Sequence, residues 1–239
     1  MAQISSMKIE LCAASFESIQ LAKELKIDRI ELCQNLEQGG LTPSIGMIDY
    51  ALAQEIDTHV LIRPRAGGFC YTEEELTVML LDIGYCKRIG VQGIVIGLLT
   101  ETNDINRVQL EQVCEAAQGI DITFHRAFDD TVEWKRSMEL LINMGIKRIL
   151  TSGVSTNVDS GFQVLKEMMN FSKGRIEIMA GGGINANNVT KLSTEIHPDA
   201  IHFSGTTKTL LDEESLFSET VLKVDRKKVS RIINSLMVN

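Results

Sequence analysis

The sequence predicts a (β/α)8 barrel of the TIM type, an α/β fold, built as a single domain over residues 1–239. Three observations support it. Short apolar runs alternate with amphipathic stretches along the chain, eight such units fit into 239 residues, and glycines follow several of the predicted strands. A doubly wound open sheet uses the same local units, and only the count of eight and the glycine positions favour the barrel over it.

The predicted strands are short apolar runs with a helical segment after each. In chain order they are Lys8–Cys12, Arg29–Cys33, His59–Arg63, Gly93–Leu98, Asp121–His125, Arg148–Thr151, Glu177–Ala180 and Ala200–Ser204.

Several helix starts are also readable. Thr42 before Pro43 predicts an N-cap, and Thr72 with Glu75 has the spacing of a capping box. Asp130-Thr131 predicts the start of the fifth helix, which should stop near Gly145. The long connection from Thr206 to Asp225 is open to three interpretations: a lid, an extra short helix or an oligomer contact. Its acidic run, 212–214, is predicted to face solvent.

Composition excludes several classes of partner. The net charge of −8 argues against non-specific nucleic-acid binding, which depends on Lys and Arg. No apolar run approaches the roughly 20 residues needed to cross a bilayer, and no signal-peptide pattern opens the chain. The five cysteines are odd in number and widely spaced, without a CxxC pair, so neither a disulfide framework nor a zinc site is indicated. We therefore expect a cytoplasmic protein without nucleic-acid or membrane partners.

A four-residue sequence, Ile-Glu-Leu-Cys, ends both of the first two predicted strands. Strand alternation sends the aliphatic residues toward the outer helices and places Glu10, Cys12, Glu31 and Cys33 inside the barrel near its mouth. Active sites of this fold lie at that C-terminal face, so the four side chains are candidate site residues.

Other polar residues follow the third and fifth strands. Arg63 and Arg65 share a face across Pro64 and are predicted to pair with the buried glutamates, while His125 ends the fifth strand. Glu10, Glu31 and His125 are the candidate catalytic acids and bases of an enzyme. Alternatively, the charged residues form only a buried structural ion network, and His125 is a core histidine.

Glycine-rich turns follow the seventh and eighth strands. We predict an anion site there from Gly181, Gly182, Gly183, Ser204 and Gly205, because glycine backbone N–H groups approach phosphate closely at this end of the fold. Arg63 and Arg65 are the predicted cationic partners of the anion. The alternative is that these glycines only form tight turns.

The cysteines of the two repeats permit a metal site. Neighbouring strands lie ~4.8 Å apart, so Cys12 and Cys33 could bring their sulfur atoms together. Two thiolates suit Cu(I), whereas a structural zinc site would use four ligands. Otherwise the two cysteines simply fill the barrel throat.

The sequence resembles the CutC copper homeostasis proteins over essentially its whole length. The resemblance is carried by Glu10 with Cys12, Arg29 to Ser44, Ile62 to Arg65 with Gly67-Gly68, Thr123 to Asp129, Leu150 to Gly153, Ala180 to Ile184, and His202 to Gly205. It implies a cytoplasmic barrel, a homo-oligomer (dimer or tetramer), and Cu(I) bound at Cys12 and Cys33.

Three functions therefore remain open. The first is a copper homeostasis protein that binds Cu(I) at the barrel mouth. The second is an enzyme that acts on an anionic or phosphorylated small molecule through Glu10, Glu31 and His125. The third is a non-catalytic partner protein.

Overall fold

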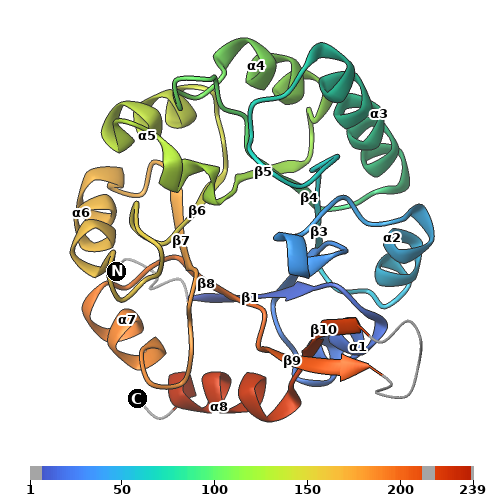
Figure 1. The fold of residues 1–239 in the computed structure, drawn as a ribbon. Helices are drawn as coiled ribbons and strands as arrows, with labels where there is room; N and C mark the ends of the chain where they lie inside the picture. The colour runs from blue at the N-terminus through green and yellow to red at the C-terminus, as the bar shows by residue number, and fades with distance from the viewer. Residues whose placement is uncertain (1–6, 212–218, 238–239) are drawn as a thin grey trace.

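Eight parallel strands close into a barrel in chain order in the computed structural model, which describes residues 7–211 and 219–237 (Figure 1). The closed order confirms the predicted fold and excludes the open sheet. The strand ends lie within two residues of their predicted positions. The strands are β1 (Lys8–Ala13), β2 (Arg29–Leu32), β3 (Thr58–Leu61), β4 (Gly93–Ile96), β5 (Asp121–Phe124), β6 (Arg148–Thr151), β7 (Glu177–Gly181) and β8 (Ala200–Phe203).

Eight helices in the described part of the chain form the outer ring (Figure 1). Outward-facing strand residues such as Ile30, Ile94 and Ile149 are fully buried beneath these helices, in one continuous apolar layer. The helices are α1 (Phe16–Glu24), α2 (Ile45–Leu52), α3 (Glu73–Ile89), α4 (Arg107–Ala116), α5 (Trp134–Asn143), α6 (Phe162–Ser172), α7 (Val189–Glu195) and α8 (Arg226–Met237), with two 3-10 turns, η1 (Leu36–Gln38) and η2 (Arg126–Asp130).

Helix starts were predicted less well than strands. The Thr72 capping box is present, and Gly145 follows α5 with a φ of 74°. The prediction for Thr42 is wrong, because its backbone N–H and side-chain oxygen bond to the backbone of Arg63, and Ser44 caps α2 instead. The predicted start at Asp130-Thr131 is also wrong: Thr131 donates to Phe128 and closes η2, and α5 begins after Glu133.

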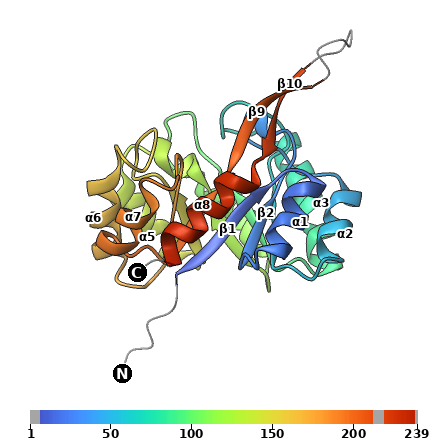
Figure 2. The ribbon, with the colours of Figure 1, turned by 90° about the horizontal axis from the view of Figure 1, so that it is seen from below.

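The connection after β8 is a β-hairpin. Strands β9 (Thr206–Leu211) and β10 (Glu219–Val224) pair in antiparallel register and project beyond the barrel (Figure 2). The expectation of an extra short helix is wrong for the described part of this connection. The acidic run 212–214 lies outside the described residues. None of the helices in the described ranges has the length and apolar character that a membrane span requires.

Candidate functional site

A carboxylate deep inside the barrel is neutralised by two basic side chains. Glu10 is fully buried, and its oxygens accept hydrogen bonds from Arg29 Nε and, at 2.8 Å, from His202 Nδ1. The strand register explains both contacts, because Glu10 pairs with Arg29 on β2 and with His202 on β8. We call Glu10, Arg29 and His202 the lower layer.

The charges of the lower layer support one another. Burial opposes the charged form of Glu10, but the His202 hydrogen bond and the Arg29 charge outweigh it and hold the pKa of Glu10 well below its usual range. Burial also opposes the charged form of His202, yet the nearby Glu31 and Glu10 raise the pKa of His202 well above its usual value. Glu10 is therefore an ionised structural carboxylate near neutral pH.

The second copy of the repeat lies one interior layer closer to the mouth. Cys12 pairs in register with Glu31, and its Sγ lies 3.6 Å from Cys33 Sγ and 3.9 Å from Glu31 Oε1. All three side chains are buried. The alternation of the strands thus brings together the two thiols and Glu31, whereas the prediction that Glu10 also lies near the mouth is wrong, because its register with Arg29 and His202 places it in the lower layer.

The Cys12 thiol is protonated near neutral pH, and Glu31 is protonated in part. The hydrogen bond to Cys33 and burial raise the pKa of the Cys12 thiol well above its usual value, and burial raises the pKa of Glu31 to about 7. A metal ion bound here would have to displace a thiol proton, since the thiolate is the ligand.

One ligand candidate was missed by the sequence reasoning. Cys12, Glu31 and His202 each offer a ligand atom, and these atoms lie within 4.8 Å of one another. Because Nδ1 of His202 is bonded to Glu10, Nε2 is the nitrogen left for a metal, which is the usual carboxylate–histidine arrangement behind a metal ligand. The signal was the position of His202 on β8, beside Glu10, which only the register reveals.

Glu31, His125 and the thiol of Cys12 share one cavity of about 220 Å³, which we call the mouth cavity. It is lined by Cys12, Glu31, Leu36, Gly39, Leu61, Arg63, Phe69, His125, Arg126, Leu150 and His202.

His125 enters the mouth cavity from the start of η2. The backbone N–H of Ala127 donates to Nδ1 of His125 at 3.0 Å, and the Phe69 ring packs against the imidazole at a centroid distance of 4.8 Å. Burial and the charge of Arg63 lower the pKa of His125 to about 3. The ring is therefore neutral at pH 7, and its proton is on Nε2.

The two predicted arginines lie in different places. Arg63 is buried in the mouth cavity and donates to the carbonyl oxygens of Gln38, Gly40 and Gly67. Arg65 is more exposed and pairs with Glu75 at the start of α3. The prediction that both pair with the buried glutamates is wrong, because Pro64 begins a loop in which the arginines bind carbonyl oxygens and Glu75.

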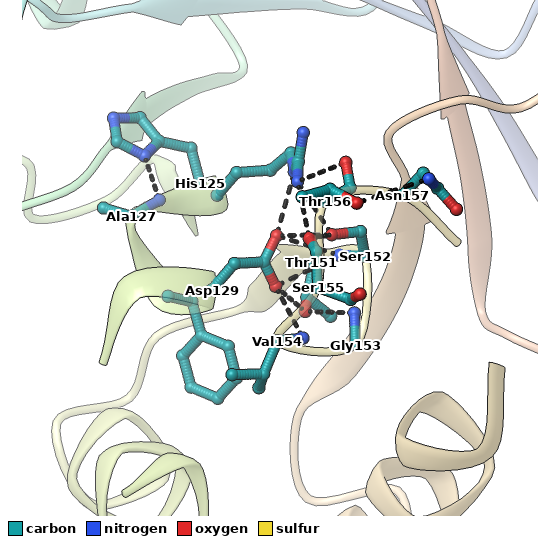
Figure 3. A network of polar contacts seen from close by, with 12 residues as sticks. His125, Ala127, Asp129, Thr151, Ser152, Gly153, Val154, Ser155, Thr156 and Asn157 are labelled. Carbon is teal, nitrogen blue, oxygen red and sulfur yellow. Dashed lines mark hydrogen bonds and ion pairs between the residues drawn. The ribbon is translucent and has the colours of Figure 1, made fainter. Parts of the chain in front are cut away.

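A second network holds the loop after β6 against η2 (Figure 3). Asp129 accepts hydrogen bonds from the side chains of Thr151 and Ser152 and from the backbone N–H of Ser152 and Val154. Arg126 donates to the same carboxylate through Nε at 2.8 Å. The network therefore fixes the guanidinium of Arg126 at the edge of the mouth cavity.

The residues of the predicted anion site lie in two different places. Gly183, Ser204 and Gly205 line a cavity of about 480 Å³ together with Lys228 and Arg231 of α8; we call it the β7–β8 cavity. Neither predicted arginine lines it, and sequence reasoning missed the two basic residues of α8.

Gly181 and Gly182 have other surroundings. A Cβ at Gly181 would lie 2.5 Å from Leu150, and a Cβ at Gly182, whose φ is +100°, would lie 3.0 Å from the guanidinium of Arg126. These two glycines thus make room for neighbouring side chains and do not line the β7–β8 cavity.

The fold and the site define a (β/α)8 barrel whose mouth holds thiols, carboxylates, imidazoles and a buried arginine. The chain matches the CutC family over residues 7–207 and belongs to that family. It is 42% identical to a CutC family protein of Glaesserella parasuis over 214 residues, or 87% of each chain. A CutC family protein of Pasteurella multocida is 42% identical over 200 residues, which covers 83% of this chain and 82% of the relative.

Solved structures agree with the fold. A crystal structure of CutC from Streptococcus agalactiae, described as a candidate copper homeostasis protein, is 34% identical, with a TM-score of 0.78 over 82% of this chain and 97% of that one. Phosphoribosyl anthranilate isomerase from Thermotoga maritima shares the fold alone, at 14% identity and a TM-score of 0.61 over 97% of this chain and 98% of that one.

Proposed function

We propose that this protein binds Cu(I) in the barrel mouth through Cys12 and Cys33 and serves copper homeostasis. One observation carries the proposal: the two Sγ atoms lie 3.6 Å apart in a buried site. Thiolates are the ligands that Cu(I) prefers, and burial protects the ion from oxidation and exchange. The description of the Streptococcus agalactiae CutC as a candidate copper homeostasis protein supports the same function.

Neighbouring groups fit this role. His202 offers an imidazole nitrogen within 4.8 Å of the Cys12 ligand atom, and Glu31 Oε1 lies beside the Cys12 thiol, where it accepts the proton that metal binding releases. Cys12, Glu31 and His202 alone resemble the three-ligand set of a catalytic zinc site. The second thiol, Cys33, favours Cu(I) over zinc.

The test is a Cu(I) titration of reduced, metal-free protein against a chelator of known affinity. Cys12→Ser/Cys33→Ser should lose Cu(I) affinity by several orders of magnitude, while the matched control Cys70→Ser, an exposed thiol outside the mouth cavity, should bind like the wild type. Unchanged affinity in the double variant, or zinc binding that excludes Cu(I), would overturn the proposal.

The β7–β8 cavity supports a second candidate function, an enzyme acting on an anionic or phosphorylated small molecule. Lys228 and Arg231 supply positive charge there, next to the glycine turn at Gly183 and Gly205. Glu31 and His125 line the neighbouring mouth cavity and would serve as the acid–base groups for a substrate that reaches both cavities, whereas Glu10, predicted as a third such group, is buried in the lower layer and lines neither cavity. Titration with inorganic phosphate tests it: Lys228→Gln/Arg231→Gln should weaken binding at least tenfold, and a wild type without phosphate affinity would eliminate this function.

We also propose that the protein acts in the cytoplasm as a homo-oligomer. All five cysteines are free thiols, as expected in a reducing compartment. Light scattering of the purified protein tests the oligomer, and a monomer at micromolar concentration would contradict it.

A further inference from the structure

The mouth cavity contains a buried positive charge without a matching carboxylate. Arg63 is 6% exposed, and its Nη atoms donate to three backbone carbonyl oxygens. The ion pairs among the described residues do not include Arg63, although buried charges are normally paired. Its Nε also lacks a partner, but the unpaired hydroxyl oxygen of Tyr71 lies beside it and can accept a hydrogen bond from Nε–H. The guanidinium also lies over the Phe69 ring, 5.3 Å from its centroid, but no carboxylate of the described residues pairs with its charge.

A neutral donor lies on the same side of the cavity. Nδ1 of His125 accepts from Ala127, so the ring presents an N–H at Nε2. That nitrogen is buried and bonds to none of the described residues. An unsatisfied buried donor is unfavourable, and such groups in native proteins usually indicate a water or ligand that binds there.

A second guanidinium extends this wall. Arg126 is held by Asp129 through Nε and by Ser152 through Nη2, and it borders the mouth cavity. Within the described ranges, Nη1 of Arg126 has no hydrogen-bond acceptor. Gly182 leaves the space that this group occupies.

Another residue of the cavity lining, Glu31, has the complementary chemistry. Glu31 uses Oε1 toward Cys12, whereas Oε2 is buried and finds no partner in the described part of the chain. This oxygen can receive a hydrogen bond from a ligand hydroxyl. The cavity therefore joins an anion-binding wall at Arg63, His125 and Arg126 to a hydroxyl-binding wall at Glu31.

We infer that the mouth cavity binds a small α-hydroxycarboxylate, with its carboxylate toward Arg63, His125 and Arg126 and its hydroxyl toward Glu31. The cavity volume of about 220 Å³ is below the range for drug-sized ligands and suits a molecule of this class. A carboxylate neutralises the buried arginine, and the α-hydroxyl supplies a donor for the unpaired oxygen of Glu31. The inference uses groups other than the two thiols, so it goes beyond the proposed copper site.

The test compares lactate with its neutral analogue lactamide by calorimetry on the reduced, copper-free wild-type protein. Lactate should bind at least about tenfold more tightly than lactamide, because only the anion compensates the buried charge. This comparison needs no variant and so is independent of any effect on folding. Equal affinities, or no lactate binding by the folded protein, would overturn the inference.

Variants then locate the site. His125→Phe keeps an aromatic ring against Phe69 but removes the donor, and it should weaken lactate binding about tenfold. Arg65→Gln is the matched control, because Arg65 does not line the cavity. Cys33→Ser, at a residue that does not line the cavity, should weaken Cu(I) binding and retain lactate, which separates the two proposals. Lactate binding that is unchanged in His125→Phe would place the ligand elsewhere and refute the assignment.

Discussion

Two copies of the same four residues, Ile9–Cys12 and Ile30–Cys33, reach different environments in the same barrel. The first carboxylate, Glu10, is bonded to Arg29 and His202 in the lower layer. The second, Glu31, stands beside the Cys12 thiol with one oxygen unpaired among the described residues.

The stagger between neighbouring strands causes this difference. β1 and β2 pair Cys12 with Glu31, so the second glutamate lies two residues closer to the mouth than the first. In the lower layer, Glu10 contacts basic residues of both flanking strands. One layer closer to the mouth, Glu31 contacts a thiol and lines the mouth cavity. The comparison separates a charge that stabilises the fold from a charge that is available to a ligand.

Removal of the arginine from the lower layer should have the largest effect. Arg29→Met leaves Glu10 buried with His202 as its remaining partner, and the free energy of unfolding should fall by about 3–5 kcal/mol. Urea denaturation at pH 7 measures it. Glu10→Gln/Arg29→Met removes both charges and should recover most of the loss. A single variant that is no less stable than the double variant would show that the lower layer is not held by this ion pair.

The free energy of unfolding should depend on pH through His125 in the mouth cavity. Its pKa is about 3 in the folded protein and about 6.5 in the unfolded chain. Between these values the unfolded chain binds a proton that the folded protein does not, so stability is complete above pH 6.5 and falls as pH decreases toward 3. The contribution approaches roughly 1.4 kcal/mol per pH unit. His125→Phe should lack it, and parallel stability curves from urea titrations of the two proteins would contradict this.

The two repeat glutamates should respond with opposite sign to the same substitution. Burial raises the pKa of Glu31 from 4.5 to about 7, so the folded state retains a proton that the unfolded chain loses above pH 4.5, and stability falls as pH rises toward 7. Glu31→Gln should therefore gain stability over the wild type at pH 8, by up to about 3 kcal/mol. Glu10→Gln should lose stability there, because the lowered pKa of Glu10 makes its charge stabilising. Thermal unfolding at pH 5 and pH 8 measures the stability change in each variant. Changes of the same sign at pH 8 would contradict the distinction between the two glutamates.

An exposed arginine provides the smallest expected effect. Arg65→Gln breaks the ion pair with Glu75. The side chains of Arg65 and Glu75 are 39% and 25% exposed, and surface ion pairs contribute about 1 kcal/mol or less to the free energy of unfolding. Urea denaturation in low and high salt measures the loss, which should shrink with added salt. A loss as large as that of Arg29→Met would mean that burial does not decide the strength of these pairs.

The barrel was predictable because its signals are local. Strand alternation and apolar runs depend on neighbouring residues, and the same is true of the Thr72 capping box. The prediction for Thr42 failed because a distant strand end, at Arg63, occupies both its hydrogen-bonding groups. A cap residue that binds across the fold cannot be recognised from its neighbours in the sequence.

The site was predictable only in part. Alternation places Glu10, Cys12, Glu31 and Cys33 inside the barrel, and it places Arg29 on the same face as Glu31. The partnership of Glu10 with Arg29 and His202 depends on the stagger between strands, which no single strand encodes. The Arg126 position depends on Asp129 and the loop after β6, and it likewise needed the structure.

The β9–β10 hairpin follows β8 and contacts the loop after β2, so it crosses the place where β1 and β8 close the barrel. β1 and β8 close the ring at the level of the strands, and β10 lies against η1, where the Leu222 N–H donates to the Glu37 side chain. The loop that carries η1 also carries Gly40, which packs on Cys33. One short loop therefore connects the hairpin to the Cys33 thiol, which lies beside Cys12 in the barrel interior, and this ties the projecting arm of the molecule to its interior.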